Sequence, residues 1–314
     1  MPKVSVLVPV YGVEKYIERC ARSLFEQTLD DMEFIFVDDC TPDRSIDVLN
    51  KVLTEYPSRQ KQVKIIHHDK NQELPQARQT GLKAATGEYI AHCDSDDWVD
   101  VDLYESLYEK ASKNNLDVVI FNSKTSNGTQ IVHEYYEKGI LDRNACINEM
   151  MRGKMWWSLC NKMFKKTIYG NSIAYPKDSM GEDMCLTLQL FYFCKSIGYV
   201  DRYYYYFINS NSIIQQISEE KCLSKFHQVV RNVEIVKDLY QPLKSFDGGI
   251  HYLEYNTKFT LLPFLGNKKI YNLWKNTFKG CEWSVLFDSK VKFKERIRAL
   301  CFICGYIPRK RFKQ

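Results

Sequence analysis

The chain has 314 residues, of which 45% are hydrophobic, and a formal net charge of +5. This length and composition predict one large or two modest domains with a sizeable core, and they exclude a disordered chain, a collagen-like repeat and a small disulfide-stapled domain. No apolar run is long enough to span a membrane, and the apolar start of the chain is too short for an export signal. With eleven cysteines, these features predict free thiols in a reducing, cytoplasmic compartment.

The first 125 residues alternate between predicted strands and helices. Apolar runs predict strands at residues 4–9, 33–37, 63–66, 89–93 and 117–121. Apolar residues at helical spacing predict helices at residues 13–28, 45–56 and 75–86. This alternation predicts an α/β fold with a mostly parallel sheet covered by helices, in which ligands bind beyond the carboxyl ends of the strands.

The remainder of the chain divides into two further parts. Residues 126–217 are less regular and contain a predicted helix near Glu182 and a predicted strand at 203–207. Residues 218–314 follow a helical pattern, with no Gly- or Pro-rich linker before them. We therefore expect three parts with boundaries at 1–125, 126–217 and 218–314.

The strongest local signal is the run Asp94-Ser95-Asp96-Asp97, which follows the fourth predicted strand. A turn at a strand end directs several carboxylates toward one point, and hard divalent cations prefer oxygen ligands. A metal held there can neutralise the charge on a departing diphosphate. The alternative is a solvated acidic turn that caps a helix starting near Asp102.

Other polar side chains lie at the ends of nearby elements. Asp38 and Asp39 end the second predicted strand and suit hydrogen bonding to a base or a ribose, although they could also form a simple turn. Tyr11, after the first strand, could pack on a base or cover the sheet edge. Arg78, on the third predicted helix, could bind a phosphate or remain solvated.

Glu182 and Asp183 lie at the start of a predicted helix. A helix N-terminus favours an ionised carboxylate, which could act as a general base toward a hydroxyl. The alternative is that one of the two carboxylates caps the helix.

Several common sites are not supported. No GxGxxG follows the first strand and no GxxxxGK[ST] occurs, which argues against a dinucleotide enzyme and a P-loop NTPase. The histidines at positions 67, 68 and 92 do not have a zinc-site spacing. The single CxxC, at residues 301–304, has no second pair and is interpreted as an apolar helix face.

Taken in order, these motifs resemble the family 2 glycosyltransferases, which are inverting enzymes of the GT-A fold that use nucleotide-sugars. The resemblance covers about residues 1–215. In the first half it rests on residues 4–11, 36–43, 76–81 and 87–90 and on the run at 94–97. In the second half, Cys160-Asn161-Lys162-Met163-Phe164 and Gly181-Glu182-Asp183 resemble motifs of bacterial polysaccharide enzymes.

The resemblance implies a role for each matching residue. A nucleotide-sugar donor, with uridine diphosphate as its nucleotide, would be held by Pro9, Val10, Tyr11, Asp38, Asp39, Arg78, Asp94 and Ser95. Mn²⁺ or Mg²⁺ would be bound by Asp96 and Asp94, with Asp96 the direct ligand. Glu182 and Asp183 would be the catalytic pair, with Asp183 as the base.

The same resemblance implies the fold and the reaction. The fold would be a Rossmann-like α/β/α sandwich with a helical C-terminal extension. Residues 1–125 would bind the donor and residues 126–217 the acceptor, which would be a glycan or a lipid-linked glycan. An acceptor hydroxyl would displace the diphosphate and invert the anomeric carbon, in the assembly of a surface polysaccharide.

The C-terminal part carries most of the net charge. Residues 281–314 contain nine Lys or Arg and three Asp or Glu, whereas the preceding 280 residues contain 35 and 36. In a predicted terminal helix, Phe293, Ile297 and Leu300 share one face, and Lys290, Lys294 and Arg298 line another. This pattern is typical of a helix on an anionic membrane surface, here over residues 290–313 at the inner face of the plasma membrane, or of an ordinary packed helix with a basic outer face. Nucleic acid is not expected as a partner, since the neutral body offers no basic groove.

Two other functions are compatible with parts of the pattern. A phosphatase of the haloacid dehalogenase type also places a DxD after a strand, but usually after the first strand and with Thr or Val where this chain has Trp98. A nucleotide-sugar-binding protein without catalytic activity is the second alternative. The presence of Asp94, Asp96 and Asp183 argues against it, and donor hydrolysis would distinguish the two.

Overall fold

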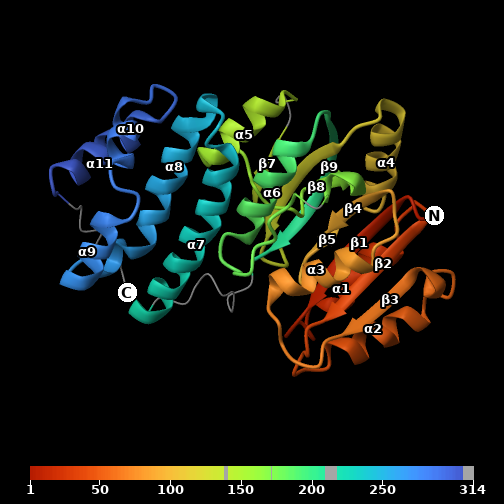
Figure 1. The fold of residues 1–314 in the computed structure, drawn as a ribbon. Coiled ribbons are helices and arrows are strands. Elements are labelled where there is room, and N and C mark those ends of the chain that lie inside the picture. The colour runs from red at the N-terminus through yellow and green to blue at the C-terminus, as the bar shows by residue number, and fades with distance from the viewer. Residues whose placement is uncertain (138–140, 171, 209–217, 307–314) are drawn as a thin grey trace.

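The computed structural model describes residues 1–137, 141–170, 172–208 and 218–306. It consists of a curled α/β sheet with helices on both faces, followed by a block of helices (Figure 1). The strands are β1 (Val4–Val10), β2 (Met32–Asp38), β3 (Val63–His67), β4 (Tyr89–His92), β5 (Trp98–Val99), β6 (Val118–Ser126), β7 (Ile131–Tyr135), β8 (Lys162–Lys165) and β9 (Ile197–Phe207).

The helices that cover the sheet are α1 (Ile17–Phe25), α2 (Ser45–Thr54), α3 (Leu74–Ala84), α4 (Leu103–Asn114), α5 (Arg143–Met151) and α6 (Glu182–Phe193). The helices that follow the sheet are α7 (Glu219–Tyr240), α8 (Asp247–Thr257), α9 (Lys268–Asn276), α10 (Cys281–Phe287) and α11 (Phe293–Ile303). Among the described residues, no helix is both long and apolar enough to cross a bilayer.

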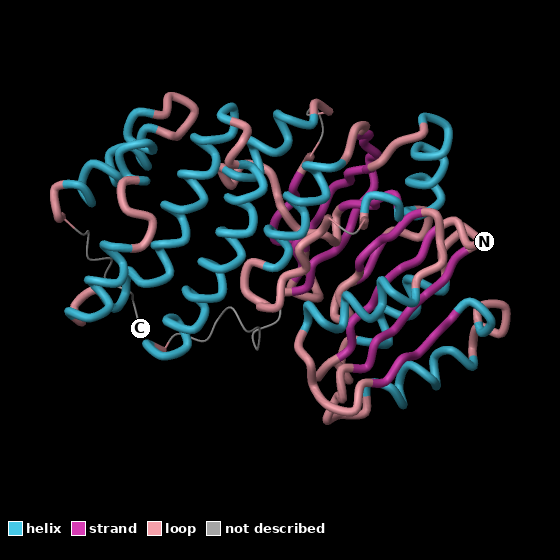
Figure 2. Tube along the Cα trace, in the orientation of Figure 1, coloured by secondary structure: helices cyan, strands magenta, loops and turns pink. Residues whose placement is uncertain are grey.

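The strands, magenta in Figure 2, form one sheet in the order β3-β2-β1-β4-β8-β6-β9-β5, with β7 paired to β6. The first four are parallel to one another, as predicted. The second half is mixed, because β8 lies antiparallel to both β4 and β6, while β6 and β9 are parallel. The α/β fold is therefore confirmed, but the sheet as a whole is mixed rather than mostly parallel. Side-chain alternation along a strand is the same for parallel and antiparallel pairing, so the sequence pattern could not have indicated the direction of β8.

In the first half of the sheet, β1, β2 and β4 are buried on both faces, whereas the edge strand β3 is partly exposed. On β1, the side chains of Val6 and Val8 pack in a cluster with α1, α2 and α4, whereas Leu7 packs in a second cluster with α3. Alternating side chains therefore serve opposite faces, which explains why β1 reads as a continuous apolar run. The result is three layers, with the carboxyl ends of β1, β2, β3 and β4 at one edge.

Two further apolar clusters organise the rest of the chain. One cluster joins β6 and β8 to α5, α6, α7 and α8. The other lies among α7, α8, α9, α10 and α11. The second cluster fills the end of the molecule that is opposite to α2 and β3 in Figure 1.

Candidate active site

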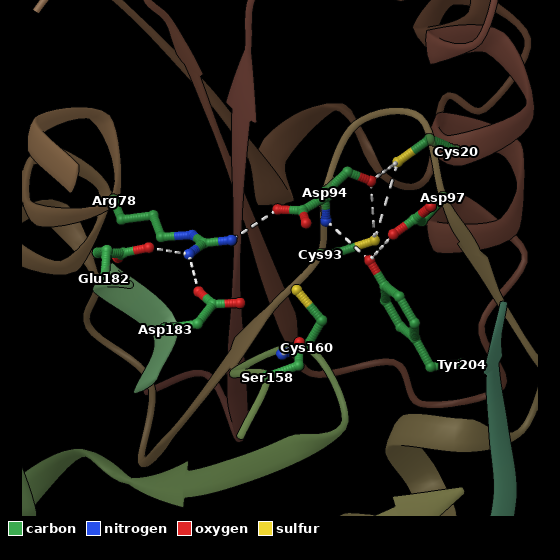
Figure 3. Close-up of polar contacts among 10 residues, drawn as sticks. All are labelled: Cys20, Arg78, Cys93, Asp94, Asp97, Ser158, Cys160, Glu182, Asp183 and Tyr204. Carbon is green, nitrogen blue, oxygen red and sulfur yellow. Dashed lines mark hydrogen bonds and ion pairs between the residues drawn. The ribbon is translucent and has the colours of Figure 1, made fainter. Parts of the chain in front are cut away.

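The acid turn, defined as residues 94–97, follows β4 and is held in place by β9. The backbone N–H of Asp94 donates to the Tyr204 hydroxyl at 3.0 Å, and that hydroxyl donates to the Asp97 carboxylate at 2.5 Å (Figure 3). The second oxygen of Asp97 accepts from the backbone N–H of Phe207 at 2.7 Å. Tyr204 therefore connects both ends of the turn to the second half of the sheet.

The acidic residues of this turn differ in exposure. Asp97 is fully buried, and burial together with the charges of Asp96 and Asp94 raises its pKa well above the ordinary range. Asp94 and Asp96 are half-buried. The turn does not cap α4, because Asp102 occupies the N-cap position and its side chain forms no capping bond in the described structure. Asp94 and Asp96 are thus the two carboxylates of the turn that a ligand can reach.

Arg78, on α3, connects the acid turn to the start of α6. Its Nη2 donates to Asp94 at 2.8 Å, and its Nη1 donates to both Glu182 and Asp183. The guanidinium side chain is only 3% exposed. Burial opposes its charge, but the three carboxylates outweigh burial and hold the pKa of Arg78 well above its usual value. The alternative of a solvated surface arginine is therefore wrong.

Glu182 and Asp183 begin α6, after Gly181 at the N-cap with a left-handed φ of 79°. Neither carboxylate caps the helix in the described structure, since both point to Arg78 (Figure 3). Their environments differ. The Glu182 side chain is 3% exposed, and burial raises its pKa to about 8 although Arg78 opposes this shift.

Asp183 is the more accessible member of the pair, with a side chain that is 30% exposed. Burial would raise its pKa, but the charge of Arg78 outweighs burial, and the pKa of Asp183 lies below its usual value. Of the two carboxylates, Asp183 is therefore the one that is both ionised at neutral pH and open to solvent.

His92 lies behind this cluster at the end of β4. Its Nε2 is 3.0 Å from the Tyr169 hydroxyl, and both side chains line a small cavity with Arg78 and Glu182. Burial and the nearby Arg78 charge lower the pKa of His92 to about 3. His92 is therefore neutral, and it adds no second positive charge next to Arg78.

The predicted nucleotide-binding residues of β1 and β2 lie at the same edge of the sheet. Pro9 and Val10 end β1, and the Tyr11 side chain is 51% exposed beyond them. Asp38 ends β2 opposite His67 in the parallel β2–β3 register. These residues lie along neighbouring strand ends. In the described structure no hydrogen bond or ion pair joins their side chains to the Arg78 cluster, which consists of Arg78, Asp94, Glu182 and Asp183.

Sequence reasoning did not assign the partners of Asp38 and Asp39. His67 Nδ1 lies 2.8 Å from Asp38, and His68 Nδ1 lies 2.7 Å from Asp39. His68 also reaches the Thr80 hydroxyl on α3 at 3.0 Å. Only part of this signal was present in the sequence, since the two histidines directly follow a predicted strand; the pairing of that strand with β2, which brings them beside the acids, comes from the structure.

Lys162 is a second residue whose contacts could not be read from its sequence motif, residues 160–164. Its side chain is fully buried, and its Nζ donates to the carbonyls of Trp156 and Ser158 at 2.7 and 2.9 Å and to Asn161 Oδ1 at 2.6 Å. These bonds hold the segment 156–161, which includes Ser158 and Cys160 beside Asp94 and Asp183 in Figure 3. Trp156 itself stacks on Tyr135 at 5.3 Å between ring centroids.

The chemistry of the acid turn fits a divalent cation held together with a phosphate ligand. Among the described residues, no three His, Cys, Asp or Glu side chains are arranged to hold a metal by themselves. Mg²⁺ and similar ions commonly take one or two carboxylates and complete their coordination with water and substrate phosphates. Asp94 and Asp96 supply two such carboxylates, whereas Ser95 is buried, with 5% exposure.

Residues 5–169 match the family described as Glycosyl transferase family 2, and the chain belongs to this family. The resemblance seen in the motifs is thereby confirmed. The family assignment leaves the phosphatase alternative without support.

Two relatives come from Bacillus subtilis. The chain is 32% identical to the putative glycosyltransferase EpsH over 232 residues, and 30% identical to the uncharacterized glycosyltransferase EpsJ over 224 residues. These matches cover 70% and 68% of this chain, and in each case 64% of the relative. The chain thus spans somewhat less than two thirds of the length of these relatives.

A similar fold occurs in a solved structure of residues 1–349 of TarS from S. aureus in complex with UDP-GlcNAc. The TM-score is 0.62 at 16% sequence identity, and the match covers 97% of this chain and 92% of the other. At this identity the likeness concerns the fold, and it confirms the GT-A architecture with a helical C-terminal region.

Proposed function

We propose that this chain is an inverting, metal-dependent glycosyltransferase. It would transfer a sugar from a nucleotide-sugar, with UDP as the expected nucleotide, to a hydroxyl of a glycan or lipid-linked glycan in surface polysaccharide assembly. The observation that carries the proposal is the Arg78 cluster. A single buried guanidinium holds the acid turn, through Asp94, next to the more accessible Asp183. In the proposed reaction, the leaving-group site and the base would lie on either side of this cation.

The donor would bind at the carboxyl edge of β1, β2 and β4. Its base and ribose would contact Tyr11, Asp38 and Asp39, with Pro9, Val10 and Ser95 shaping the backbone around them. The exposed Tyr11 ring is available for stacking. The proposed division of labour is residues 1–125 for the donor, 126–217 for the acceptor and 218–314 as the helical extension.

The metal would be held by Asp96 and Asp94 with the diphosphate of the donor. When bound, Mn²⁺ or Mg²⁺ supplies positive charge that stabilises the departing diphosphate. Arg78 cannot take over this task by itself, because its charge already faces three carboxylates.

Asp183 would accept the proton of the attacking hydroxyl. Arg78 keeps its carboxylate ionised and fixes its orientation, and Glu182 would support the same arrangement as the second member of the catalytic pair. Attack opposite to the leaving group breaks the glycosidic bond to the diphosphate and inverts the anomeric carbon. A carboxylate base with a low pKa accepts its proton late, when the hydroxyl bond to the sugar is nearly formed.

The proposed location is the cytoplasm, at the inner face of the plasma membrane, where a lipid-linked acceptor would be reached. The basic residues at 309–313 that contribute to this expectation lie outside the described residues. No nucleic acid partner is proposed.

The test is the release of nucleoside diphosphate from a panel of UDP-, GDP- and dTDP-sugars, with and without Mn²⁺ or Mg²⁺, alongside direct donor binding. We expect metal-dependent release from one donor, a loss of about 100-fold or more in Asp96→Ala, and a similar loss in Asp183→Asn with donor binding retained. Asp238→Asn, an exposed acid on α7, is the control and should leave the rate unchanged.

Donor binding without any turnover or hydrolysis, in the presence of metal and of acceptor extracts, would instead favour the nucleotide-sugar-binding protein without catalytic activity. If no nucleotide-sugar binds under any condition, the donor assignment fails.

A further inference from the structure

Helix α11 carries a row of apolar side chains that faces solvent. Phe293, Ile297, Leu300 and Cys304 are spaced four, three and four residues apart, so they lie on one face of the helix. We call these four residues the α11 row. Phe293 is 72% exposed, Ile297 46% and Leu300 44%, and Cys304 is also exposed. The helix instead packs on the molecule through other residues, Ala299 and Phe302, which are buried.

The exposure of the α11 row bears on the two alternatives that the sequence left open for the terminal helix, a membrane-surface helix and an ordinary packed helix. A packed terminal helix would bury the apolar row and expose the basic face. In the structure the row is exposed, whereas Phe302 of the same helix is buried. Exposed apolar rows of this kind mark contact surfaces, because leaving them in water costs free energy.

Basic residues flank the α11 row on both sides. Lys294 and Arg298 follow members of the row by one position, and Arg296 precedes Ile297 by one, which places cations on either side of the row. Lys290 and Lys292 lie just before the helix. Lys290, Lys292 and Lys294 are exposed, and none forms an ion pair with another described residue.

The neighbouring helix α10 adds exposed aromatic area at the same end of the molecule. Trp283 is 52% exposed and Phe287 is 73% exposed, and their rings stack at 6.2 Å between centroids. Helices α10 and α11 lie side by side in Figure 1, in the same apolar cluster and away from β1, β2 and β3. Aromatic side chains are favoured at the boundary between water and lipid, where one ring edge remains near the head groups.

The charges decide between lipid and a second copy of the chain. A two-fold dimer through the α11 row would bring the same patch against itself and would place the lysines and arginines of one copy beside those of the other. An anionic bilayer offers the opposite charge to these residues and an apolar layer to the row. The pattern therefore fits an anionic lipid surface better than a copy of itself.

We propose that α10 and α11 form a peripheral docking surface for an anionic lipid bilayer. Phe293, Ile297 and Leu300 insert at the level of the lipid head groups, Trp283 and Phe287 lie at the boundary with water, and Lys290, Lys292 and Lys294 contact lipid phosphates. This surface extends the proposed membrane location to named residues. Its test requires no nucleotide-sugar, so its failure would leave the transferase proposal standing.

The experiment is co-sedimentation of the full chain with vesicles of pure phosphatidylcholine and with vesicles that also contain phosphatidylglycerol. We expect binding to the mixed vesicles that weakens as salt is raised, and little binding to the neutral ones. Phe293→Ser/Ile297→Ser should weaken binding about tenfold or more. Lys290→Gln/Lys292→Gln/Lys294→Gln should weaken it roughly 10- to 100-fold and remove the preference for anionic lipid.

Matched controls separate a docking surface from a general effect of apolar or basic residues. Leu141→Ser/Ile131→Ser removes two side chains of similar exposure elsewhere, and Lys51→Gln/Lys61→Gln/Lys70→Gln removes three exposed lysines near the other end of the molecule. Both should bind vesicles like the unaltered chain. An unchanged thermal unfolding curve establishes that each variant is folded.

Three outcomes would overturn the proposal. The first is absence of binding by the unaltered chain to anionic vesicles. The second is equal loss in the control variants. The third is a dimer that dissociates in Phe293→Ser/Ile297→Ser and does not bind vesicles, which would assign the surface to a second copy.

Discussion

At the scale of single residues, Lys162 shows how a buried charge can shape a site without touching a ligand. Its amine satisfies two backbone carbonyls and Asn161, and so determines the path of the segment beside Asp94 and Asp183. Burial lowers the pKa of Lys162 to about 8, although the charge of Glu137 opposes this. The lowered value has a measurable consequence for stability.

Between pH 8 and about 10.5, the unfolded chain keeps a proton on Lys162 that the folded chain has lost. Because the unfolded state then binds more protons, the free energy of unfolding contributed by this residue rises with pH over that window. We expect the unfolding free energy of the unaltered chain, minus that of Lys162→Met, to rise by up to about 3 kcal/mol from pH 7 to pH 10. Urea unfolding of both proteins measures this difference.

Lys51→Met, at an exposed position on α2, provides the control for removing a lysine in general. A difference for Lys162→Met that stays constant across the window, or that follows the Lys51→Met series, would contradict the buried position of the amine.

At the scale of elements, strand β9 acts as a support for the acid turn. Tyr204 accepts from the Asp94 backbone and donates to the buried Asp97, while Arg19 of α1 donates to the Asp96 carbonyl at 2.8 Å from the other side. The turn is therefore fixed by two elements that are remote from it in sequence. Its half-buried carboxylates can hold their positions without a ligand.

Removing the Tyr204 hydroxyl should loosen this turn. Tyr204→Phe leaves a buried carboxylate without one donor and should lower the free energy of unfolding by about 1–3 kcal/mol. It should also raise the Mn²⁺ concentration needed for half-maximal donor binding, because Asp94 and Asp96 are no longer held in fixed positions. Calorimetric donor titrations at several metal concentrations, with denaturant unfolding, measure both effects.

Tyr205→Phe is the matched control, since Tyr205 donates to Asp100 at 2.9 Å on the same strand but outside the acid turn. It should lose stability without a change in the metal requirement. Identical metal curves for Tyr204→Phe and Tyr205→Phe would show that the Tyr204 bond has no positioning role.

At the scale of the whole molecule, Arg78 joins the two halves of the sheet domain. It lies on α3 of the first half and reaches α6 of the second half through Glu182 and Asp183, 104 and 105 residues away. A buried cation with three carboxylates is costly to disrupt, because each remaining charge loses its partner. The stability of the junction and the geometry of the site therefore depend on the same side chain.

Arg78→Met should lower the free energy of unfolding by about 3–5 kcal/mol. Asp183→Asn in the same chain should recover part of the loss, since it removes an ionised carboxylate that Arg78 neutralised, and a double-mutant cycle of denaturant unfolding measures the coupling. Arg22→Met, whose partners Glu18 and Glu55 are exposed, should cost about 1 kcal/mol or less. Additive losses for Arg78→Met and Asp183→Asn would contradict a shared buried cluster.

Much of the fold and part of the site follow from local patterns. The parallel strands β1, β2, β3 and β4 lie close to the predicted ranges, because a short apolar run bounded by turn residues is the usual pattern of a strand. Since parallel strands end at a common edge, the acids at 38–39 and 94–97 were expected near one another. The short strands β5, β7 and β8 were not predicted: β5 has only two residues, β7 is exposed at all five positions, and β8 has a lysine at each end.

The sequence by itself determined the α/β class, the family and the residues at the strand ends, because periodicity and motif spacing are properties of neighbours along the chain. Only the tertiary structure decided the partners of Arg78, the support of the acid turn by Tyr204, and the exposure of the α11 row. The first two depend on contacts between segments that are about 100 residues apart in the sequence. The third depends on how α11 packs, since Phe293 has the same local sequence pattern whether it faces the core or solvent.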